Sequence, residues 1–218
     1  ADGLRVVADE EALPFADQSF DLVISVLSLH WVNDLPGTLI QINRCLKPDG
    51  LFLGAILGGE TLHELRSALL DGEINIEGGA SPRVSPFAEI RDAGGLLQRA
   101  GFALPVADVE TLTVTYPDTL SLMQELRGMG ETNALRKRRL APTQRDTFAA
   151  AAHSYSNRFG DQDGRIPATF DILTLTAWRP DPSQPQPMKP GTANTRLADA
   201  LKVQEHSLPD KAGPGPKT

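Results

Sequence analysis

Two acidic residues near the start of the chain have the position and chemistry of a ligand-binding site. Asp9 and Glu10 directly follow residues 4–8, an apolar run interrupted only by Arg5. Such a run is typical of a strand buried on both faces, and open α/β sheets bind ligands at the carboxyl ends of such strands. A carboxylate there accepts a hydrogen bond from an amine. The alternative is that Asp9 only caps a loop.

His30 and Trp31 follow a second apolar run, residues 20–26, in the place where substrate chemistry is expected. Histidine changes its protonation near neutral pH and serves as a general base, which makes His30 a candidate catalytic residue. The alternative is a packed or capping histidine at the entry of a helix. Trp31 is better suited to form a wall of the pocket than to react.

Spacing argues against several other chemistries. His63 and Glu64 begin a zinc-protease-like motif, but Ser67 stands where the second histidine is required. No pair of cysteines or histidines has metal-ligand spacing, so we expect no protein-bound metal. Residues 79–83 lack the final glycine of a nucleophile elbow. The single cysteine, Cys45, cannot form an internal disulfide and falls in an apolar helical pattern.

The first third of the chain predicts a strand–helix–strand unit preceded by one more strand. Residues 4–8, 20–26 and 51–57 have the composition of buried strands, and residues 34–46 have the periodicity of a helix. Pro48-Asp49-Gly50 is typical of a turn. Short connectors around a single helix imply parallel strands joined by a right-handed crossover.

The rest of the chain predicts further helices and a closing pair of strands. Thr61 and Glu64 have the spacing of a capping box, residues 71–86 resemble a long loop, and residues 128–131 resemble a helix C-cap and turn. Helices are expected over 61–70, 87–100, 119–127 and 142–158, and strands over 111–116 and 169–178. The predicted fold class is α/β, a Rossmann-like sheet of parallel strands finished by an antiparallel pair, with a helical insertion.

Composition limits the classes of protein to which the chain can belong. With 218 residues, of which 40% are hydrophobic, it is long enough for one domain with additions. A net charge of −7 argues against a nucleic-acid binder held by general positive potential. No apolar run reaches the length of a membrane span. The Pro-rich segment 180–218 is expected to be disordered.

Three motifs together resemble the class I S-adenosylmethionine-dependent methyltransferases with a type 11 domain. They are Asp9 with Leu13-Pro14-Phe15, then Ser19-Phe20-Asp21-Leu22-Val23, and Leu46-Lys47-Pro48-Asp49-Gly50. The resemblance implies S-adenosylmethionine as the cofactor. It also implies that Asp9 accepts from the adenine amino group and that the Glu10 backbone touches the adenine ring. The residues that would border the sulfonium include Ser25, Val26 and Leu27.

Further motifs resemble one subgroup, the mitochondrial complex I assembly factor with a methyltransferase fold and its bacterial relatives. They include Ser28-Leu29-His30-Trp31, Gly58-Gly59-Glu60-Thr61-Leu62 and Gly128-Met129-Gly130-Glu131. The resemblance implies Trp31 and Glu60 in a substrate pocket and leaves room for a substrate role of residues 128–131. The malonyl-carrier-protein methyltransferase of biotin synthesis is a more distant neighbour that shares the His-Trp segment.

The resemblance leaves three functions open. They are an S-adenosylmethionine-dependent methyltransferase, an arginine hydroxylase that acts on a subunit of respiratory complex I, and a non-catalytic assembly chaperone. A protein substrate is therefore a possible partner, and no nucleic-acid partner is expected. The expected location is the cytoplasm for a bacterial source and the mitochondrial matrix for a eukaryotic one.

The family's glycine-rich cofactor loop is not found after any buried strand of this sequence. We therefore expect residues 1–179 to be a partial methyltransferase domain that lacks its first strand–helix–strand segment. This partial domain alone is expected to bind S-adenosylmethionine weakly or not at all. Its sheet edges and apolar faces are expected to be bare.

Overall fold

The computed structural model describes residues 4–185, 195 and 197–204. The chain divides into two compact units, Ala1–Pro182 and Ser183–Thr218. In the second unit, the described residues include one short helix, α6 (Leu197–Leu201). It lies within the segment predicted to be disordered, most of which is outside the described residues. The domain boundary near residue 180 and the disorder beyond it remain predictions.

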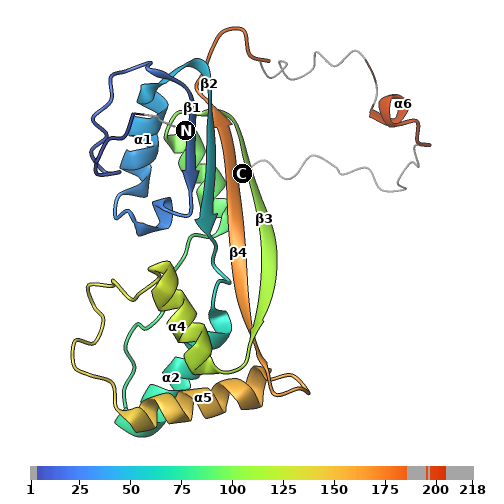
Figure 1. The fold of residues 1–218 in the computed structure, drawn as a ribbon. Helices are drawn as coiled ribbons and strands as arrows, with labels where there is room; N and C mark the ends of the chain where they lie inside the picture. The colour runs from blue at the N-terminus through green and yellow to red at the C-terminus, as the bar shows by residue number, and fades with distance from the viewer. Residues whose placement is uncertain (1–3, 186–194, 196, 205–218) are drawn as a thin grey trace, which may run out of the picture. The chain divides into compact units, whose positions relative to one another are not determined.

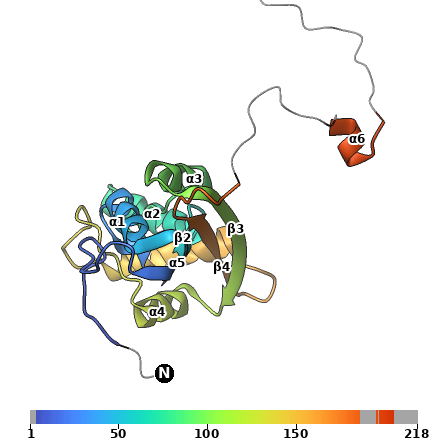
Figure 2. The same cartoon turned by 90° about the horizontal axis from the view of Figure 1, so that it is seen from above.

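The described strands of the first unit form a mixed sheet in the order β1-β2-β4-β3. β1 (Phe20–Val26) and β2 (Leu46–Leu57) are parallel, whereas β4 (Ile166–Trp178) runs antiparallel to both β2 and β3 (Ala103–Tyr116). Figure 2 shows β2, β4 and β3 side by side from above. The predicted α/β class, with parallel strands finished by an antiparallel pair, is confirmed.

One face of the sheet carries the first hydrophobic core. α1 (Leu35–Cys45) and α3 (Ile90–Arg99) pack there. Asp34 caps α1 by accepting a hydrogen bond of 2.9 Å from the backbone N–H of Gly37. The core side chains come from both helices and from alternate positions of β2 and β4, including Leu39, Ile42, Phe52, Ile56, Leu97, Leu173 and Leu175.

A second core lies at the other end of the long β3–β4 ribbon (Figure 1). Its helices are α2 (His63–Glu77), α4 (Thr119–Met129) and α5 (Arg145–Phe159), the predicted helical insertion. At its centre the fully buried Tyr155 donates a hydrogen bond of 2.7 Å to the Pro167 carbonyl of β4. Burial, followed by the nearby charge of Glu64, raises the pKa of this phenol.

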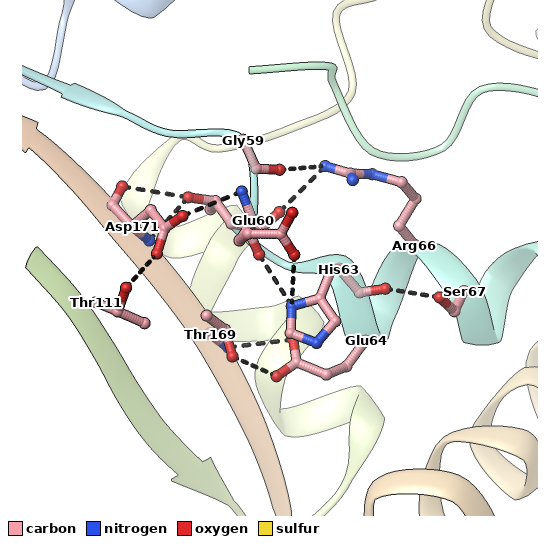
Figure 3. Close-up of polar contacts among 10 residues, drawn as sticks. Gly59, Glu60, His63, Glu64, Arg66, Ser67, Thr111, Thr169 and Asp171 are labelled. Carbon is pink, nitrogen blue, oxygen red and sulfur yellow. Dashed lines mark hydrogen bonds and ion pairs between the residues drawn. The ribbon is translucent and has the colours of Figure 1, made fainter. Parts of the chain in front are cut away.

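A buried polar cluster joins the two ends of the unit where β2 leads into α2 (Figure 3). The Asp171 carboxylate of β4 accepts from the Glu60 backbone N–H at 3.2 Å and from the Thr111 hydroxyl at 2.7 Å. The Thr61 hydroxyl donates to the Asp171 carbonyl at 3.3 Å and accepts from the Asp171 N–H at 3.1 Å. The β2–α2 connection is thereby fixed to β4.

Glu64, at the start of α2, makes a second contact with β4 (Figure 3). Its buried carboxylate accepts from the Thr169 hydroxyl at 2.5 Å and from the Thr169 N–H at 3.2 Å. The capping box predicted for Thr61 and Glu64 is therefore wrong. Both side chains bind β4 instead of the first amides of the helix, and α2 begins at His63, after Leu62 in the left-handed conformation (φ 55°).

The strand predicted at residues 4–8 is also wrong. Leu4 and Val7 are 97% and 103% exposed, and residues 4–8 lie in no ladder. A strand needs a hydrogen-bonded neighbour, and β2 is the only strand that pairs with β1 within the described part of the chain. The apolar side chains of Leu22, Ile24 and Val26 on β1 are 45%, 59% and 67% exposed, so the expected bare face is present.

Two segments predicted as a loop and a turn, residues 71–77 and 48–50, are regular structure instead. α2 continues to Glu77, through the residues 71–77 predicted as loop, because Gly72 lets it approach α5: a Cβ at Gly72 would lie 2.6 Å from the Thr147 carbonyl oxygen. Pro48-Asp49-Gly50 lies inside β2, as an irregularity between the rungs Phe20↔Leu46 and Leu22↔Leu51. The sequence pattern did not contain these tertiary contacts.

Replacing Thr61 by Val is expected to lower the free energy of unfolding by about 1–3 kcal/mol, because the backbone groups of Asp171 lose buried hydrogen bonds at nearly constant volume. Thr113→Val, at an exposed position of β3, is the matched control and should change it by less than about 0.5 kcal/mol. Urea unfolding of both variants measures the difference. Equal stabilities would contradict a structural role for the Thr61 hydroxyl.

Candidate functional site

A larger and a smaller cavity adjoin the sheet. The larger one, about 750 Å³, lies on the sheet face opposite α1 and α3. Cavities of this size hold small molecules or side chains. Most of its wall is apolar and comes from the sheet and from α2 and α4, including Leu57, Ile172, Phe170, Leu65, Leu69 and Met123. Sheet residues on the opposite face from the first core therefore build this wall.

Charged and aromatic side chains occupy the remaining wall of the larger cavity. Glu125 and Glu131 supply carboxylates, Arg83 and Arg127 supply guanidinium groups, and aromatic rings come from Trp31, Phe87 and Tyr116. Burial raises the pKa of Tyr116, and the Glu125 carboxylate beside it adds to the shift. The cavity therefore combines an apolar body with a small number of polar groups.

His30 and Glu131 form a contact between segments far apart in sequence. The His30 Nε2 atom lies 3.1 Å from Oε1 of Glu131, and the two side chains are 5% and 23% exposed. Nδ1 of His30 is buried without a hydrogen-bond partner. A proton on Nδ1 would be a buried donor without an acceptor, so the surroundings favour the tautomer in which Nε2–H donates to Glu131.

Local structure explains how these two residues meet. His30 lies on a 3₁₀ turn, η1 (Leu29–Trp31), which the buried Leu29 anchors in the first core. Glu131 follows the glycine that ends α4: Gly130 has φ 88°, and the Glu131 N–H donates to the Leu126 carbonyl at 2.9 Å. This left-handed C-cap reverses the chain and directs Glu131 toward η1.

Both terminal nitrogens of the Arg83 guanidinium already have hydrogen-bond partners. It donates to Glu73 and to the Thr143 hydroxyl, each at 2.5 Å, and Glu73 also accepts from the backbone and hydroxyl of Ser81 at 2.7 Å. Burial raises the pKa of Glu73, but the bonds from Arg83 and Ser81 outweigh it and hold the pKa below its usual value of 4.5. The Arg83–Glu73 pair thus contributes no net charge to the cavity.

The smaller cavity, about 380 Å³, surrounds β1 and the start of α1. Its polar lining includes Glu10, Ser25, Ser28 and Thr38, and Val26 also borders it. The Thr38 side chain is fully buried, and its hydroxyl has no hydrogen-bond partner. An orphaned buried hydroxyl beside a cavity marks a place where a polar ligand group would gain a partner.

Residues 9–13 are fixed beside α1 by hydrogen bonds, which positions Glu10 at the smaller cavity. The Gln41 side chain donates to the Glu11 carbonyl at 2.8 Å and accepts from the Leu13 N–H at 2.9 Å. The Glu11 carboxylate accepts from the backbone of Asn33, and this bond lowers its pKa.

The predicted site residues are distributed over three places. Glu10, Ser25 and Val26 line the smaller cavity, and Leu27 and Trp31 line the larger one, with His30 enclosed behind Glu131. Asp9 is exposed, and its carboxylate accepts from the Glu11 N–H at 2.9 Å.

Glu60 lines neither cavity, and its side chain is 70% exposed beside His63. Its backbone, by contrast, belongs to the buried cluster around Asp171. The roles of all these residues remain predictions.

Sequence reasoning missed the contribution of Thr38 and underrated that of Glu131. Thr38 is an ordinary helix residue in the sequence, and its orphaned hydroxyl is visible only in three dimensions. Glu131 carried a signal, the preceding Gly130, whose left-handed conformation sets its direction. No cluster of metal-ligating side chains occurs among residues 4–185, 195 and 197–204, and none of the helices described is long and apolar enough to cross a membrane.

Comparison with known proteins shows what this chain is similar to. Residues 2–54 match the model described as methyltransferase domain. The chain is 50% identical over 198 residues to the mitochondrial arginine-hydroxylase NDUFAF5 of Danio rerio and 46% identical over 208 residues to that of Homo sapiens. It is 38% identical over 181 residues to the malonyl-[acyl-carrier protein] O-methyltransferase of Gallionella capsiferriformans.

These matches cover 91%, 95% and 82% of this chain but only 61%, 60% and 59% of the three relatives. The chain therefore spans about three fifths of their length. Among solved structures, a putative methyltransferase from Bacillus halodurans superimposes with a TM-score of 0.50 at 15% identity, covering 80% of this chain and 76% of that one. This likeness shows the fold, a Rossmann-like α/β sheet.

The Glu73–Arg83 pair predicts a pH dependence of stability. Because the folded pKa of Glu73 is lowered, its stabilising contribution is present above pH 4.5 and is lost as the pH falls through the lowered pKa. Glu73→Gln leaves Arg83 without its partner and should lower the free energy of unfolding by roughly 3 kcal/mol at neutral pH.

The difference between wild type and Glu73→Gln, measured by urea unfolding from pH 7 downward, should shrink below pH 4.5. Asp92→Asn, at an exposed position of α3, should show no such loss at neutral pH. A difference that stays constant with pH would disprove the assignment to this ion pair.

Proposed function

We propose that this chain forms the substrate side of an S-adenosylmethionine-dependent methyltransferase, which the match of residues 2–54 to the methyltransferase domain model supports. The observation that carries the proposal is the position of residues 25–31. Ser25, Val26 and Ser28 line the smaller cavity, whereas Leu27 and Trp31 line the larger. One short segment therefore borders both cavities, as a transfer between a cofactor and an acceptor requires.

The smaller cavity suits part of the cofactor. Small hydroxyl side chains, the orphaned Thr38 hydroxyl and the apolar residues around them offer hydrogen bonds and a surface for a nucleoside. Bound S-adenosylmethionine would supply the methyl group. In this proposal Asp9 and Glu10 hold the adenine, and Ser25, Val26 and Leu27 border the methionine half.

The larger cavity is proposed to hold the acceptor. Methyl transfer asks little of side chains beyond an in-line approach, exclusion of water and a deprotonated acceptor. The apolar wall excludes water, and Glu131, which is bonded to the enclosed His30, places a carboxylate on that wall. His30 remains the proposed catalytic residue of this reaction and Trp31 a proposed wall, whereas the exposed Glu60 would contact only a large substrate.

Hydroxylation of an arginine side chain is the second candidate reaction. Relatives that are 46–50% identical over more than nine tenths of this chain are named arginine-hydroxylases. The two cavity carboxylates, Glu125 and Glu131, are also suited to a cationic side chain. The acceptor would then be a protein, as expected for an assembly factor of a respiratory complex. The names of these relatives include the word mitochondrial, which supports the mitochondrial matrix for a eukaryotic source; a bacterial source would place the protein in the cytoplasm.

Mass spectrometry of candidate arginine-containing subunits distinguishes the reactions. We expect a mass gain of one CH₂ group for methyl transfer, or of one oxygen atom for hydroxylation, after incubation with the full-length protein and its cofactor. Unmodified arginines together with undisturbed complex assembly would instead favour the non-catalytic chaperone.

Asp9→Ala in the full-length protein is expected to weaken S-adenosylmethionine binding about tenfold, because the cofactor loses one charge-assisted hydrogen bond. Isothermal titration calorimetry measures the affinity. Asp108→Ala is the matched control, since Asp108 is also exposed and its carboxylate also accepts from a nearby backbone N–H, that of Val109 at 2.9 Å. Equal losses in both variants would remove Asp9 from the cofactor site.

A further inference from the structure

We propose that Glu131, held in place by His30, is the group of the larger cavity that recognises a guanidinium, so that an arginine side chain is the preferred occupant. The inference rests on the proposed function and assigns the roles within it. Glu131 would contact the substrate. His30, the candidate base of the proposed function, would instead be a positioning residue that acts through Glu131.

Exposure separates the roles of the two side chains. Glu131 lines the larger cavity and is 23% exposed, whereas His30 is 5% exposed and lies outside the cavity wall. Oε1 of Glu131 is occupied by His30 Nε2 at 3.1 Å, and Oε2 has no hydrogen-bond partner within the part of the chain that the structure describes. One carboxylate oxygen is thus held, and the other is available to a ligand.

The surroundings of Glu131 favour a cation over a neutral ligand. A carboxylate beside apolar walls loses much of its hydration, so a positive partner there gains more than it would in water. The cavity that it lines is largely walled by hydrocarbon, including Leu126, Met129 and Leu57. A neutral ligand of the same shape would leave this charge uncompensated.

The other charges of the cavity do not cancel this preference. Arg83 is neutralised by Glu73. Arg127, which is exposed, carries one positive charge against the two carboxylates of Glu125 and Glu131. With Arg83 counted together with its partner Glu73, one negative charge remains, which matches one guanidinium.

Aromatic rings favour a flat cation on an aliphatic stem. The Trp31 ring lies 5.6 Å from the His30 ring and the Phe87 ring lies 6.1 Å from it, and both residues line the same cavity as Glu131. A planar guanidinium stacks on such rings while it bonds a carboxylate, and a compact ammonium does so less well. The apolar body of the cavity would receive the methylene groups of the arginine.

The test compares binding of Nα-acetyl-L-arginine amide with that of its neutral isostere, Nα-acetyl-L-citrulline amide, by ligand-observed NMR titration of the full chain at fixed ionic strength. We expect the arginine compound to bind about tenfold more tightly, as one charge-assisted hydrogen bond predicts. Glu131→Gln should abolish this preference. Glu110→Gln, at an exposed site on β3 outside the cavity, should preserve it.

Two His30 variants separate positioning from proton transfer. His30→Gln keeps an N–H donor near Nε2 but is no base, so it should retain the arginine preference, whereas His30→Leu should lose it. If Glu131→Gln does not fold, as judged by circular dichroism, the comparison of His30→Gln with His30→Leu tests the role of Glu131 instead. Equal binding of the two probes by wild type, or a preference that survives in Glu131→Gln, would overturn the assignment.

The mass-spectrometric assay keeps the two proposals separate. Modified arginines together with an unchanged preference in Glu131→Gln would refute the role of Glu131 and leave the proposed function standing. An arginine preference that depends on Glu131, with no modified arginine, supports the binding site and counts against the reaction.

Discussion

The hydrogen bonds between β4 and the β2–α2 connection are the contact on which the rest of the first unit depends. The two hydrophobic cores are separate clusters, and β4 contributes to both: Leu173 to the first and Ala168 to the second. Asp171 lies between them, and its backbone N–H and carbonyl both bond the Thr61 hydroxyl, while the Glu64 carboxylate accepts from Thr169. Because these groups are buried, an alternative placement of α2 would leave several of them unsatisfied. These hydrogen bonds to β4 hold α2 at one position beside the sheet, where α2 forms part of the wall of the larger cavity.

The site then follows from contacts that are distant in sequence. The segment after β1 supplies residues to both cavities, but the wall opposite it comes from the helical insertion, through Glu125 and Glu131. His30 and Glu131 are 101 residues apart and meet because Gly130 ends α4 in the left-handed conformation. Apolar packing gives the cavity its size, and this single polar contact gives one of its carboxylates a fixed direction.

Local patterns predicted the elements that are stabilised locally or by a regular ladder. The cap at Asp34, the apolar face of α1 and the antiparallel pair β3–β4 all appear as the sequence indicates. Predictions failed where a tertiary partner decided the outcome. Thr61 and Glu64 have the right spacing for a capping box, but β4 offers them better partners. Gly72 suggests a loop until α5 is placed against it, and residues 4–8 resemble a buried strand but have no neighbour to pair with. In the site, residue types at the end of β1 were predictable, whereas the enclosure of His30 was not.

The two cavities draw on different elements, which bears on the similarity of this chain to relatives with differently named reactions. Proteins named arginine-hydroxylase and malonyl-[acyl-carrier protein] O-methyltransferase both align with more than three quarters of this chain. The smaller cavity is built from β1 and the start of α1, whereas the larger one is built partly from the end of α4 and the residues after it. No residue between 125 and 133 lines the smaller cavity. Under the proposed function, substitutions in this segment would therefore alter the charge and shape offered to an acceptor without changing the residues proposed to hold the cofactor, so differences in substrate should concentrate there.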